Sequence, residues 1–263
     1  DIRIYMSLLI FTILNNSTEI INFPENYENS LAQNLKDKNT DVVSNTLRII
    51  SIIKPHPPAE LQSDIIKLVN HDDISMRCSA IYTLSKFRPI TNVIEDMLIK
   101  YSKERINNNS CKTFAIRGLK EIYDLENDVL EIIINSLKDE EVTARQEALT
   151  VLSELGTSAK KSLPNIRQIA INSQETELVR RHAINAMYRI GNDDQIVVET
   201  LSICIEKDEK ETIRLSALAY LGEMGPNSAN VIEKINKIIN DKYENKFIRQ
   251  KAIETMEKIK GKK

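Results

Sequence analysis

The sequence predicts an all-α fold, a right-handed α-α superhelix (a solenoid) of about seven helix-pair repeats. Two observations support this prediction. First, a small residue recurs every 33 to 35 residues along the 263-residue chain, a period typical of stacked supersecondary units. Second, apolar residues follow each small residue at +1, +4 and +7, which places them on one face of a helix. The small positions are Thr46, Ala80, Ala115, Ala148, Ala183, Ala217 and Ala252.

Residues 139–172 illustrate the helix pair expected in a repeat. Three acidic residues precede the first helix, where negative charge faces the positive end of the helix dipole. Gly156 follows the last apolar position and is expected to end that helix in a left-handed conformation. Gly191 and Gly225 occupy the same position in the next two repeats. The second helix should begin near Pro164, because proline is tolerated at the start of a helix but not in its interior.

The chain is interpreted as a single solenoid with distinct ends. Residues 1–37 form a degenerate N-terminal repeat, residues 38–244 the core repeats, and residues 245–263 a C-terminal capping helix with a Lys tail. The apolar run at residues 4–14 is too short to span a bilayer. A signal-peptide core is the alternative interpretation of this run, although no small-x-small cleavage site follows it. For the basic C-terminal segment, a solvated helix end is expected, with docking to an acidic surface as the alternative.

The composition is that of a folded chain without a strongly charged face. Hydrophobic residues make up 41% and charged residues 28% of the chain, and the formal net charge is only −2. Binding of single-stranded nucleic acid would call for a continuous basic face with stacking aromatic residues, yet aromatic residues amount to 5%. Nucleic acid is therefore disfavoured as a partner.

The three cysteines are expected to be buried free thiols. Cys78 and Cys111 lie at similar places in the first helices of neighbouring repeats, and Cys204 follows two repeats later. Adjacent packed helices lie about 8–10 Å apart, whereas the Cα atoms of a disulfide lie within about 7 Å of each other. Free thiols slightly favour a reducing, cytoplasmic location over an exported one.

The repeating pattern resembles that of a known family. An acidic turn, then Val/Ile-Arg-x-x-Ala, then a stripe of large apolar residues ending in Gly is similar to the HEAT repeat, and more narrowly to the short HEAT-like repeats of the phycobilin lyase type. The segments Val179-Arg180 to Gly191 and Ile213-Arg214 to Gly225 match best. The resemblance implies a structural role for the arginine, which would bond the acidic turn of its own or the next repeat. The arginines at this position are Arg77, Arg145, Arg180, Arg214 and Arg249.

No set of residues predicts catalysis, a cofactor or a metal. His56, His71 and His182 are the only histidines, and the expected stacking separates them too widely to share a metal or form a dyad. The acidic clusters all fall in turns before helices, where capping explains them. Phosphate loops, Cys-x-x-Cys pairs and nucleophile elbows are not found in the sequence.

The functional prediction is a non-enzymatic protein-binding scaffold that holds a protein or peptide partner in a concave groove of stacked second helices. A subunit or accessory factor of a chromophore (bilin) lyase is the alternative, and nucleic-acid binding comes third. No membrane span and no small-molecule substrate are indicated. The polar connection 102–110 is a second candidate edge for binding, whereas first-helix positions such as Lys86, Glu121 and Glu154 are expected to be exposed and uninvolved. The predicted groove residues are Glu95, Lys100, Glu131, Asn135, Arg167, Gln168, Glu199 and Ser202.

Overall fold

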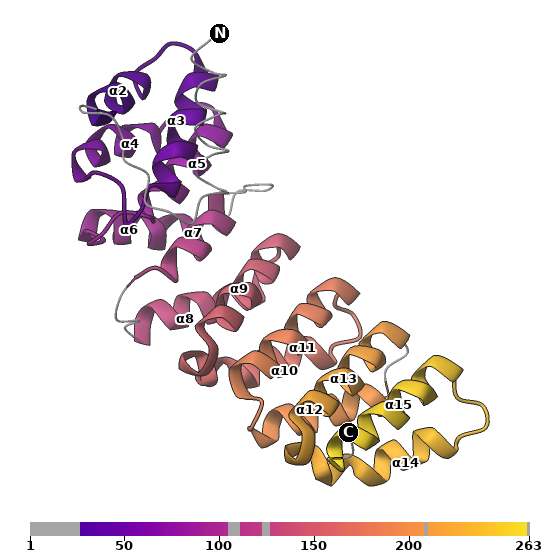
Figure 1. Cartoon of the computed structure of the whole chain (residues 1–263). Helices are drawn as coiled ribbons and strands as arrows, with labels where there is room; N and C mark the ends of the chain where they lie inside the picture. The colour runs from indigo at the N-terminus through magenta and orange to yellow at the C-terminus, as the bar shows by residue number, and fades with distance from the viewer. Residues whose placement is uncertain (1–26, 105–110, 123–126, 208–209, 262–263) are drawn as a thin grey trace. The chain divides into compact units, whose positions relative to one another are not determined.

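The structure, a computed structural model, describes residues 27–104, 111–122, 127–207 and 210–261, and every regular element within these ranges is a helix (Figure 1). The first helices of the successive pairs are α3 (Thr40–Ile52), α5 (Ile74–Leu84), α7 (Cys111–Leu119), α9 (Val142–Leu155), α11 (Glu177–Gly191), α13 (Glu211–Met224) and α15 (Lys246–Ile259). The second helices are α4 (Gln62–Leu68), α6 (Asn92–Ser102), α8 (Asn127–Asn135), α10 (Leu163–Ile171), α12 (Gln195–Lys207) and α14 (Ile232–Asn240).

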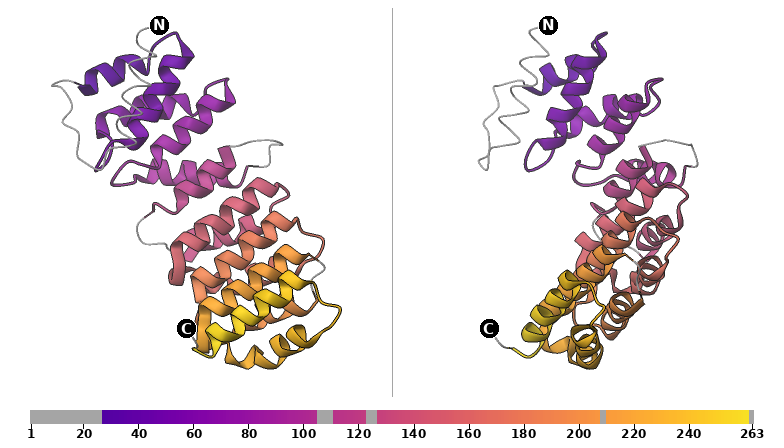
Figure 2. Two further views of the ribbon diagram at one scale, coloured as in Figure 1. Left: turned by 45° about the vertical axis from the view of Figure 1, so that its right-hand side comes forward. Right: turned by 90° about the vertical axis from the view of Figure 1, so that its right-hand side faces the viewer.

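The described residues therefore contain six complete helix pairs, with α2 (Tyr27–Asn34) before them and α15 after them. The chain forms two compact units, Asp1–Ile132 (unit 1) and Ile133–Lys263 (unit 2). Within unit 2, the first helices α9, α11, α13 and α15 lie side by side in one layer, and α10, α12 and α14 lie behind them in a second layer (Figure 2).

The seven small residues identified in the sequence are all fully buried, which confirms the repeat register. Each lies where a first helix packs against its neighbours, so a larger side chain would push the helices apart. The apolar +1 and +4 positions are buried with them, except Ile253, which is half-buried in α15, the last helix described. Because no described helix follows α15, Ile253 has no neighbour of the kind that covers the same position in earlier repeats.

Two of the three predicted glycine caps are confirmed and one is wrong. Gly156 and Gly225 both have φ 56° and end α9 and α13 in a conformation that L-residues rarely adopt. Gly191 is instead the last residue of α11, without a positive φ, and Asn192 is the C-cap. A Cβ atom there would lie 3.1 Å from Leu163 Cδ1 and 3.0 Å from Asp194 Cβ, so this glycine permits close packing. Pro164 lies in the first turn of α10, as predicted.

The expectation of three free thiols is wrong for two of them. Cys78 in α5 and Cys111 at the start of α7 form a disulfide, with their Cα atoms 4.4 Å apart. The average helix spacing behind that expectation does not apply here, because α5 and α7 approach unusually closely. Gly118 in α7 is the reason, since a Cβ atom at this position would lie 2.9 Å from Ser85 Cβ. Cys204 is a buried free cysteine, as predicted.

The arginines that precede the small residues bond the turns, as the resemblance to HEAT repeats implied. Arg145 donates from Nη1 to the carbonyl oxygens of Asp139 and Glu140 in the turn before its own helix, and from Nη2 to Glu175 Oε1 in the turn of the next repeat, 2.8 Å away. Arg214 donates from Nη1 and Nη2 to the two carboxylate oxygens of Glu244 in the turn of the next repeat, and from Nε to the carbonyl oxygen of Ile205. These arginines link successive repeats and fix the turns between them.

Arg180 occupies the same sequence position and, like Arg214, bonds the preceding second helix through its Nε. It is almost fully buried, and its Nε donates to the carbonyl oxygen of Ala170 at 3.0 Å. The end of α10 is thereby bonded directly to α11.

Some expectations concern residues outside the described ranges. Within the predicted N-terminal repeat, α2 is described and residues 1–26 are not. Residues 105–110 of the polar connection and the last two residues of the Lys tail also lie outside the described ranges. Among the residues that are described, no helix is long and apolar enough to cross a membrane.

Candidate functional site

The predicted groove residues are divided between the two units. Glu95, Lys100 and Glu131 belong to unit 1, and the other five belong to unit 2. Whether all eight share one surface therefore stays a prediction. Most of them are exposed or half-buried on α6, α8, α10 and α12.

Ser202 was expected to project from α12 and does not. It is buried, and its Oγ accepts a hydrogen bond from Lys234 Nζ at 2.6 Å. Lys234 also contacts Glu206 at 2.8 Å. Ser202 thus bonds α12 to α14, because α14 covers the side of α12 on which this residue lies. The second-helix face nearby is also largely charge-paired, with Arg167 Nη1 3.3 Å from Glu199 Oε2.

A small hollow of about 330 Å³ borders this second-helix layer and includes one predicted residue, Gln168. Its remaining lining comes mostly from the turn that Arg145 and Glu175 hold together. These two charges already pair with each other, so the remaining charges among the described residues that line the hollow are those of Lys138 and Asp139.

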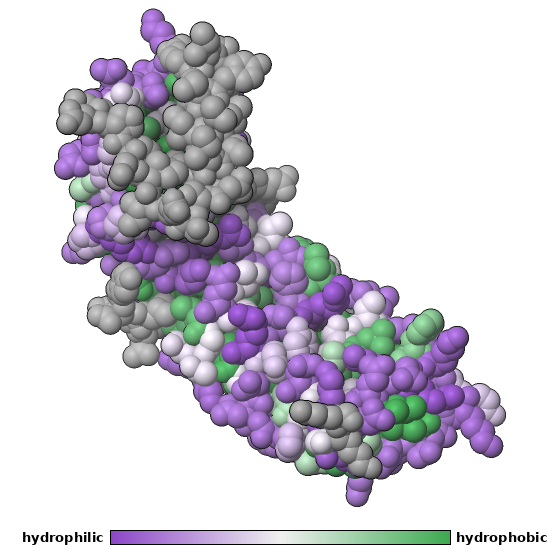
Figure 3. All heavy atoms as spheres, in the orientation of Figure 1, coloured by the Kyte–Doolittle hydropathy of each residue, from purple (hydrophilic) through white to green (hydrophobic). Residues whose placement is uncertain are grey.

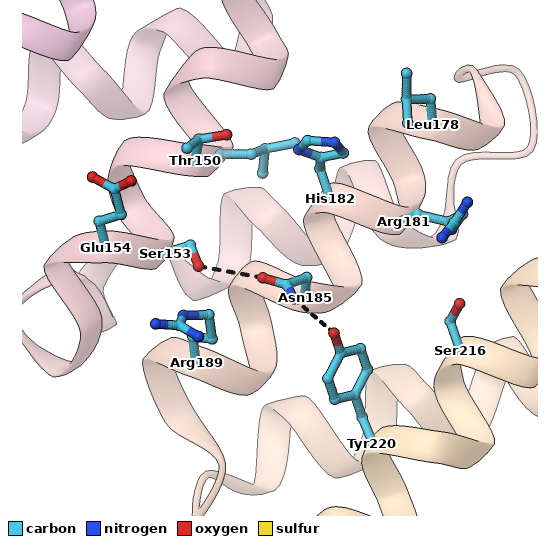
Figure 4. Close-up of a pocket in the computed structure, with 11 residues that line it drawn as sticks. Thr150, Ser153, Glu154, Leu178, Arg181, His182, Asn185, Arg189, Ser216 and Tyr220 are labelled. Atoms are coloured by element: carbon cyan, nitrogen blue, oxygen red, sulfur yellow. Dashed lines mark hydrogen bonds between the residues drawn. The ribbon is translucent and has the colours of Figure 1, made fainter. Parts of the chain in front are cut away.

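A larger hollow of about 490 Å³ lies on the opposite, first-helix layer of unit 2, where no binding residue was predicted. Its walls come from α9, α11 and α13, with α11 in the middle (Figure 4). The α11 residues that line it are spaced at i, i+3, i+4, i+7 and i+11, so they share one helix face. The lining residues are Leu149, Thr150, Ser153, Glu154, Leu178, Arg181, His182, Asn185, Arg189, Ser216 and Tyr220.

A chain of hydrogen bonds crosses the hollow and joins the three helices. Ser153 Oγ lies 3.4 Å from Asn185 Oδ1, and Asn185 Nδ2 donates to the Tyr220 hydroxyl at 2.6 Å (Figure 4). The Tyr220 ring also stacks on that of Tyr188, with 4.7 Å between centroids. These contacts hold Asn185 and Tyr220 in place, so this part of the hollow is formed before anything binds.

Two arginines distinguish this hollow from the rest of the molecule. Arg181 and Arg189 are exposed, and of the arginines in the described ranges they alone have side chains without an ion pair or hydrogen bond to the chain. Arg180, the neighbour of Arg181, is buried and bonded. The hollow therefore holds two unpaired guanidinium groups against one carboxylate, that of Glu154.

Apolar residues lie exposed along the edge of the same layer. Leu178 lines the hollow with 52% of its surface accessible, and Val142 and Phe247 are exposed at the starts of α9 and α15. In the view of Figure 3, hydrophilic residues cover most of the described surface of unit 2 and apolar residues form separate small areas. The hollow thus combines cationic groups with a limited apolar contact.

The sequence interpretation missed this site because it treated exposed first-helix positions as uninvolved. Glu154 lines the hollow instead. Glu154 is exposed, as expected, whereas Lys86 and Glu121 are each only about a quarter accessible and form an ion pair at 3.3 Å. The sequence did contain a usable signal. The structural arginines lie three residues before the small residue of each repeat, and Arg181 and Arg189 do not occupy that position.

No group of three or more His, Cys, Asp or Glu side chains within the described ranges is arranged to hold a metal ion. His182 lines the first-helix hollow, whereas His71 Nδ1 accepts a hydrogen bond from the Asp73 backbone N–H. His71 therefore helps to shape the turn before α5.

The stacked helix pairs define a helical-repeat protein of the HEAT and armadillo class. Residues 130–219, about a third of the chain, match the family model described as HEAT repeats. The narrower resemblance to the phycobilin lyase type is not tested. A comparison with curated proteins finds no match.

Solved structures show the same fold at low sequence identity. An X-ray structure of Escherichia coli YibA has a TM-score of 0.63 at 12% identity, covering 97% of this chain and 85% of that one. Kap121p bound to Ste12p has a TM-score of 0.64 at 12% identity, covering 97% of this chain and 31% of that one. A structure of Kap95p with RanGDP has a TM-score of 0.59 at 14% identity, covering 98% of this chain and 40% of that one. This chain thus spans about a third of the length of those two larger proteins.

Proposed function

We propose that this protein is a non-enzymatic binding scaffold and that the first-helix hollow of unit 2 holds an acidic segment of a protein partner. The observation that carries the proposal is the pair of unpaired arginines, Arg181 and Arg189. Arginine is enriched among the residues that contribute most to protein interfaces, because its planar guanidinium forms bidentate hydrogen bonds with carboxylates.

The spacing of the two arginines suits an extended peptide. They are eight residues apart on α11, which corresponds to about 12 Å along a helix. Carboxylates four residues apart on an extended chain are separated by about 13 Å. Between the arginines, Asn185 and His182 offer polar contacts, and Leu178 offers an apolar contact at one end. A segment with two acidic residues and one apolar residue would match this arrangement.

The second-helix groove remains the competing surface. Its charges in unit 2 are largely paired within the chain, as Arg167 with Glu199 and Lys234 with Glu206 show. A partner would have to break or share those pairs, whereas Arg181 and Arg189 lose only water. Charge complementarity therefore favours the first-helix face for an acidic partner.

The experiment compares the two surfaces by charge reversal. Immobilised full-length chain captures partners from a lysate, and mass spectrometry quantifies them for the wild type, for Arg181→Glu with Arg189→Glu, and for Lys100→Glu with Arg167→Glu. We expect the first pair to reduce capture of an acidic partner at least tenfold and the second pair to leave it unchanged. Because neither Arg181 nor Arg189 bonds to the described chain, the thermal unfolding of the first variant should match that of the wild type.

Salt provides an independent check, because contacts between exposed charges weaken as ionic strength rises. Capture that persists in the Arg181 and Arg189 variant but fails in the Lys100 and Arg167 variant would place the partner on the second helices and refute the proposed site. Capture that survives both sets of changes would refute both surfaces.

A further inference from the structure

A second hollow, in unit 1, has a larger volume of about 950 Å³. It lies among the end of α3, the loop that follows α3, and the ends of α5 and α7. Its volume falls within the range of small-molecule sites, about 300–1,000 Å³. Its walls combine apolar side chains with an aromatic ring and several charges, principally Ile52, Lys54, Tyr82, Lys86, Arg88 and Glu121.

The charges in this hollow do not balance. Among the described residues that line the hollow, Glu121 supplies the only carboxylate, and it is shared by Arg88 Nη2 at 2.6 Å and Lys86 Nζ at 3.3 Å. Lys120 Nζ lies 4.0 Å from the same carboxylate. Lys54 also lines the hollow and makes no ion pair or hydrogen bond with the described part of the chain. Three cationic side chains, those of Lys54, Lys86 and Arg88, therefore line the hollow together with the Glu121 carboxylate.

The cations nearest Glu121 are held in place by other contacts. Arg88 Nη1 donates to the carbonyl oxygens of Ser85 and Phe87 at 2.8 and 2.7 Å, so the guanidinium cannot swing away without losing both bonds. Lys86 Nζ lies 4.8 Å from the centre of the Tyr82 ring, within cation–π range. Capping the end of α5 explains the contacts of Arg88 alone. It does not explain why Lys54 and Lys86 line the same hollow as Arg88.

We propose that this hollow binds a phosphate monoester carried on an apolar or aromatic group. A phosphate monoester has a charge of −1.5 to −2 near pH 7 and three acceptor oxygens, which matches the excess of cations better than a single carboxylate does. The apolar wall formed by Ile52 and Tyr82 suits the body of such a ligand. This site lies in unit 1, is independent of the proposed function, and can be tested without knowing the protein partner.

The test uses phenyl phosphate as the probe and isothermal titration of the full-length chain as the measurement. Phenyl sulfate has nearly the same shape but only one negative charge, so it is the matched control ligand. We expect phenyl phosphate to bind at least tenfold more tightly than phenyl sulfate or benzoate. Equal binding of the three ligands, or the lack of any binding at millimolar concentration, would overturn the proposal.

Three variants separate binding from folding. Lys54→Gln should weaken phenyl phosphate binding several-fold without affecting stability, because Lys54 has no partner in the described chain. Lys38→Gln, an exposed lysine of unit 1 outside the hollow, should change nothing. Glu121→Gln should tighten binding, because it removes the anion that competes with the ligand for Lys86 and Arg88.

The Glu121→Gln result is the most discriminating. If the cations serve only to anchor Glu121, the variant will lose stability and gain no affinity, and the proposal fails. If binding tightens, comparison of phenyl phosphate with a phosphotyrosine peptide then distinguishes a small-molecule phosphate from a phosphorylated protein segment.

Discussion

The Cα atoms of Cys78 and Cys111 lie 4.4 Å apart, and seven residues further along both segments Ser85 lies against Gly118. The two contacts lie at opposite ends of the α5–α7 interface. A small residue at each contact lets the backbones approach more closely than large side chains would permit. The disulfide and the glycine therefore depend on the same local geometry.

The first prediction concerns Gly118→Ala. A Cβ atom at this position would lie 2.9 Å from Ser85 Cβ and 2.7 Å from Leu98 Cδ2, so the helices must move apart. We expect a loss of about 1–3 kcal/mol in the free energy of unfolding, the usual cost of overpacking. Denaturant unfolding at equilibrium measures it. A gain in stability would contradict the prediction. It would mean that the higher helix propensity of alanine outweighs the steric clash.

The second prediction concerns the disulfide itself. Thiol titration of the denatured, unreduced chain should detect one free thiol, that of Cys204, and reduction should raise the number to three. Reduction should also lower the free energy of unfolding by about 2–4 kcal/mol, because the bond closes a long loop in the unfolded chain. The control is the Cys78→Ala and Cys111→Ala double variant, whose stability should not respond to the reductant. Three free thiols before reduction would contradict the observed pairing.

Periodicity in the sequence was sufficient to locate the first helices. The small residues such as Ala148 and Ala183 recur at one interval because each faces the same kind of packed interface. The types of residue along the chain therefore reveal both the buried face of each first helix and the length of the repeat. The distance between α5 and α7 cannot be inferred from residue types in the same way. It depends on which side chains meet across the interface, and only the structure brings Ser85 and Gly118 together.

The candidate site was less predictable for a similar reason. Arg180 and Arg181 are neighbours in sequence, yet one is buried against Ala170 and the other lies unpaired in the hollow. Composition cannot separate these roles, because pairing depends on which groups the adjacent helices present. Ser202 was likewise expected to lie on the surface, but the helix that carries Lys234 covers it.

The third prediction tests the repeat register. Ala148→Asp and Ala183→Asp each place a carboxylate in a fully buried position between helices. We expect each to lower the free energy of unfolding by several kcal/mol, since a buried charge without a partner is strongly unfavourable. Glu154→Asp, at an exposed position, is the control and should have little effect on stability. Unchanged thermal unfolding of both buried variants would mean that the register is wrong.

The fourth prediction concerns the link between repeats formed by Arg145 and Glu175. Their side chains are only 15% and 10% exposed, and Arg145→Ala should cost roughly 1–3 kcal/mol in the free energy of unfolding. Arg167→Ala is the matched control, because its pair with Glu199 also joins successive repeats but is more exposed. Exposed pairs contribute about 0–1 kcal/mol, so the control should change stability little.

The same pair predicts how stability responds to acid. Burial alone would raise the pKa of Glu175, but hydrogen bonds from Arg145 and from Thr176 outweigh burial, so its pKa in the folded protein lies below the ordinary value of 4.5. As the pH falls, the unfolded chain therefore takes up a proton at this residue before the folded chain does. The stabilisation is complete above about pH 4.5 and is lost as the pH falls through the folded pKa. Glu175→Gln should lower stability at pH 7 and make unfolding less dependent on pH in this acidic range. If denaturant unfolding of Glu175→Gln shows the wild-type slope against pH between pH 3 and 5, the pair does not contribute as proposed.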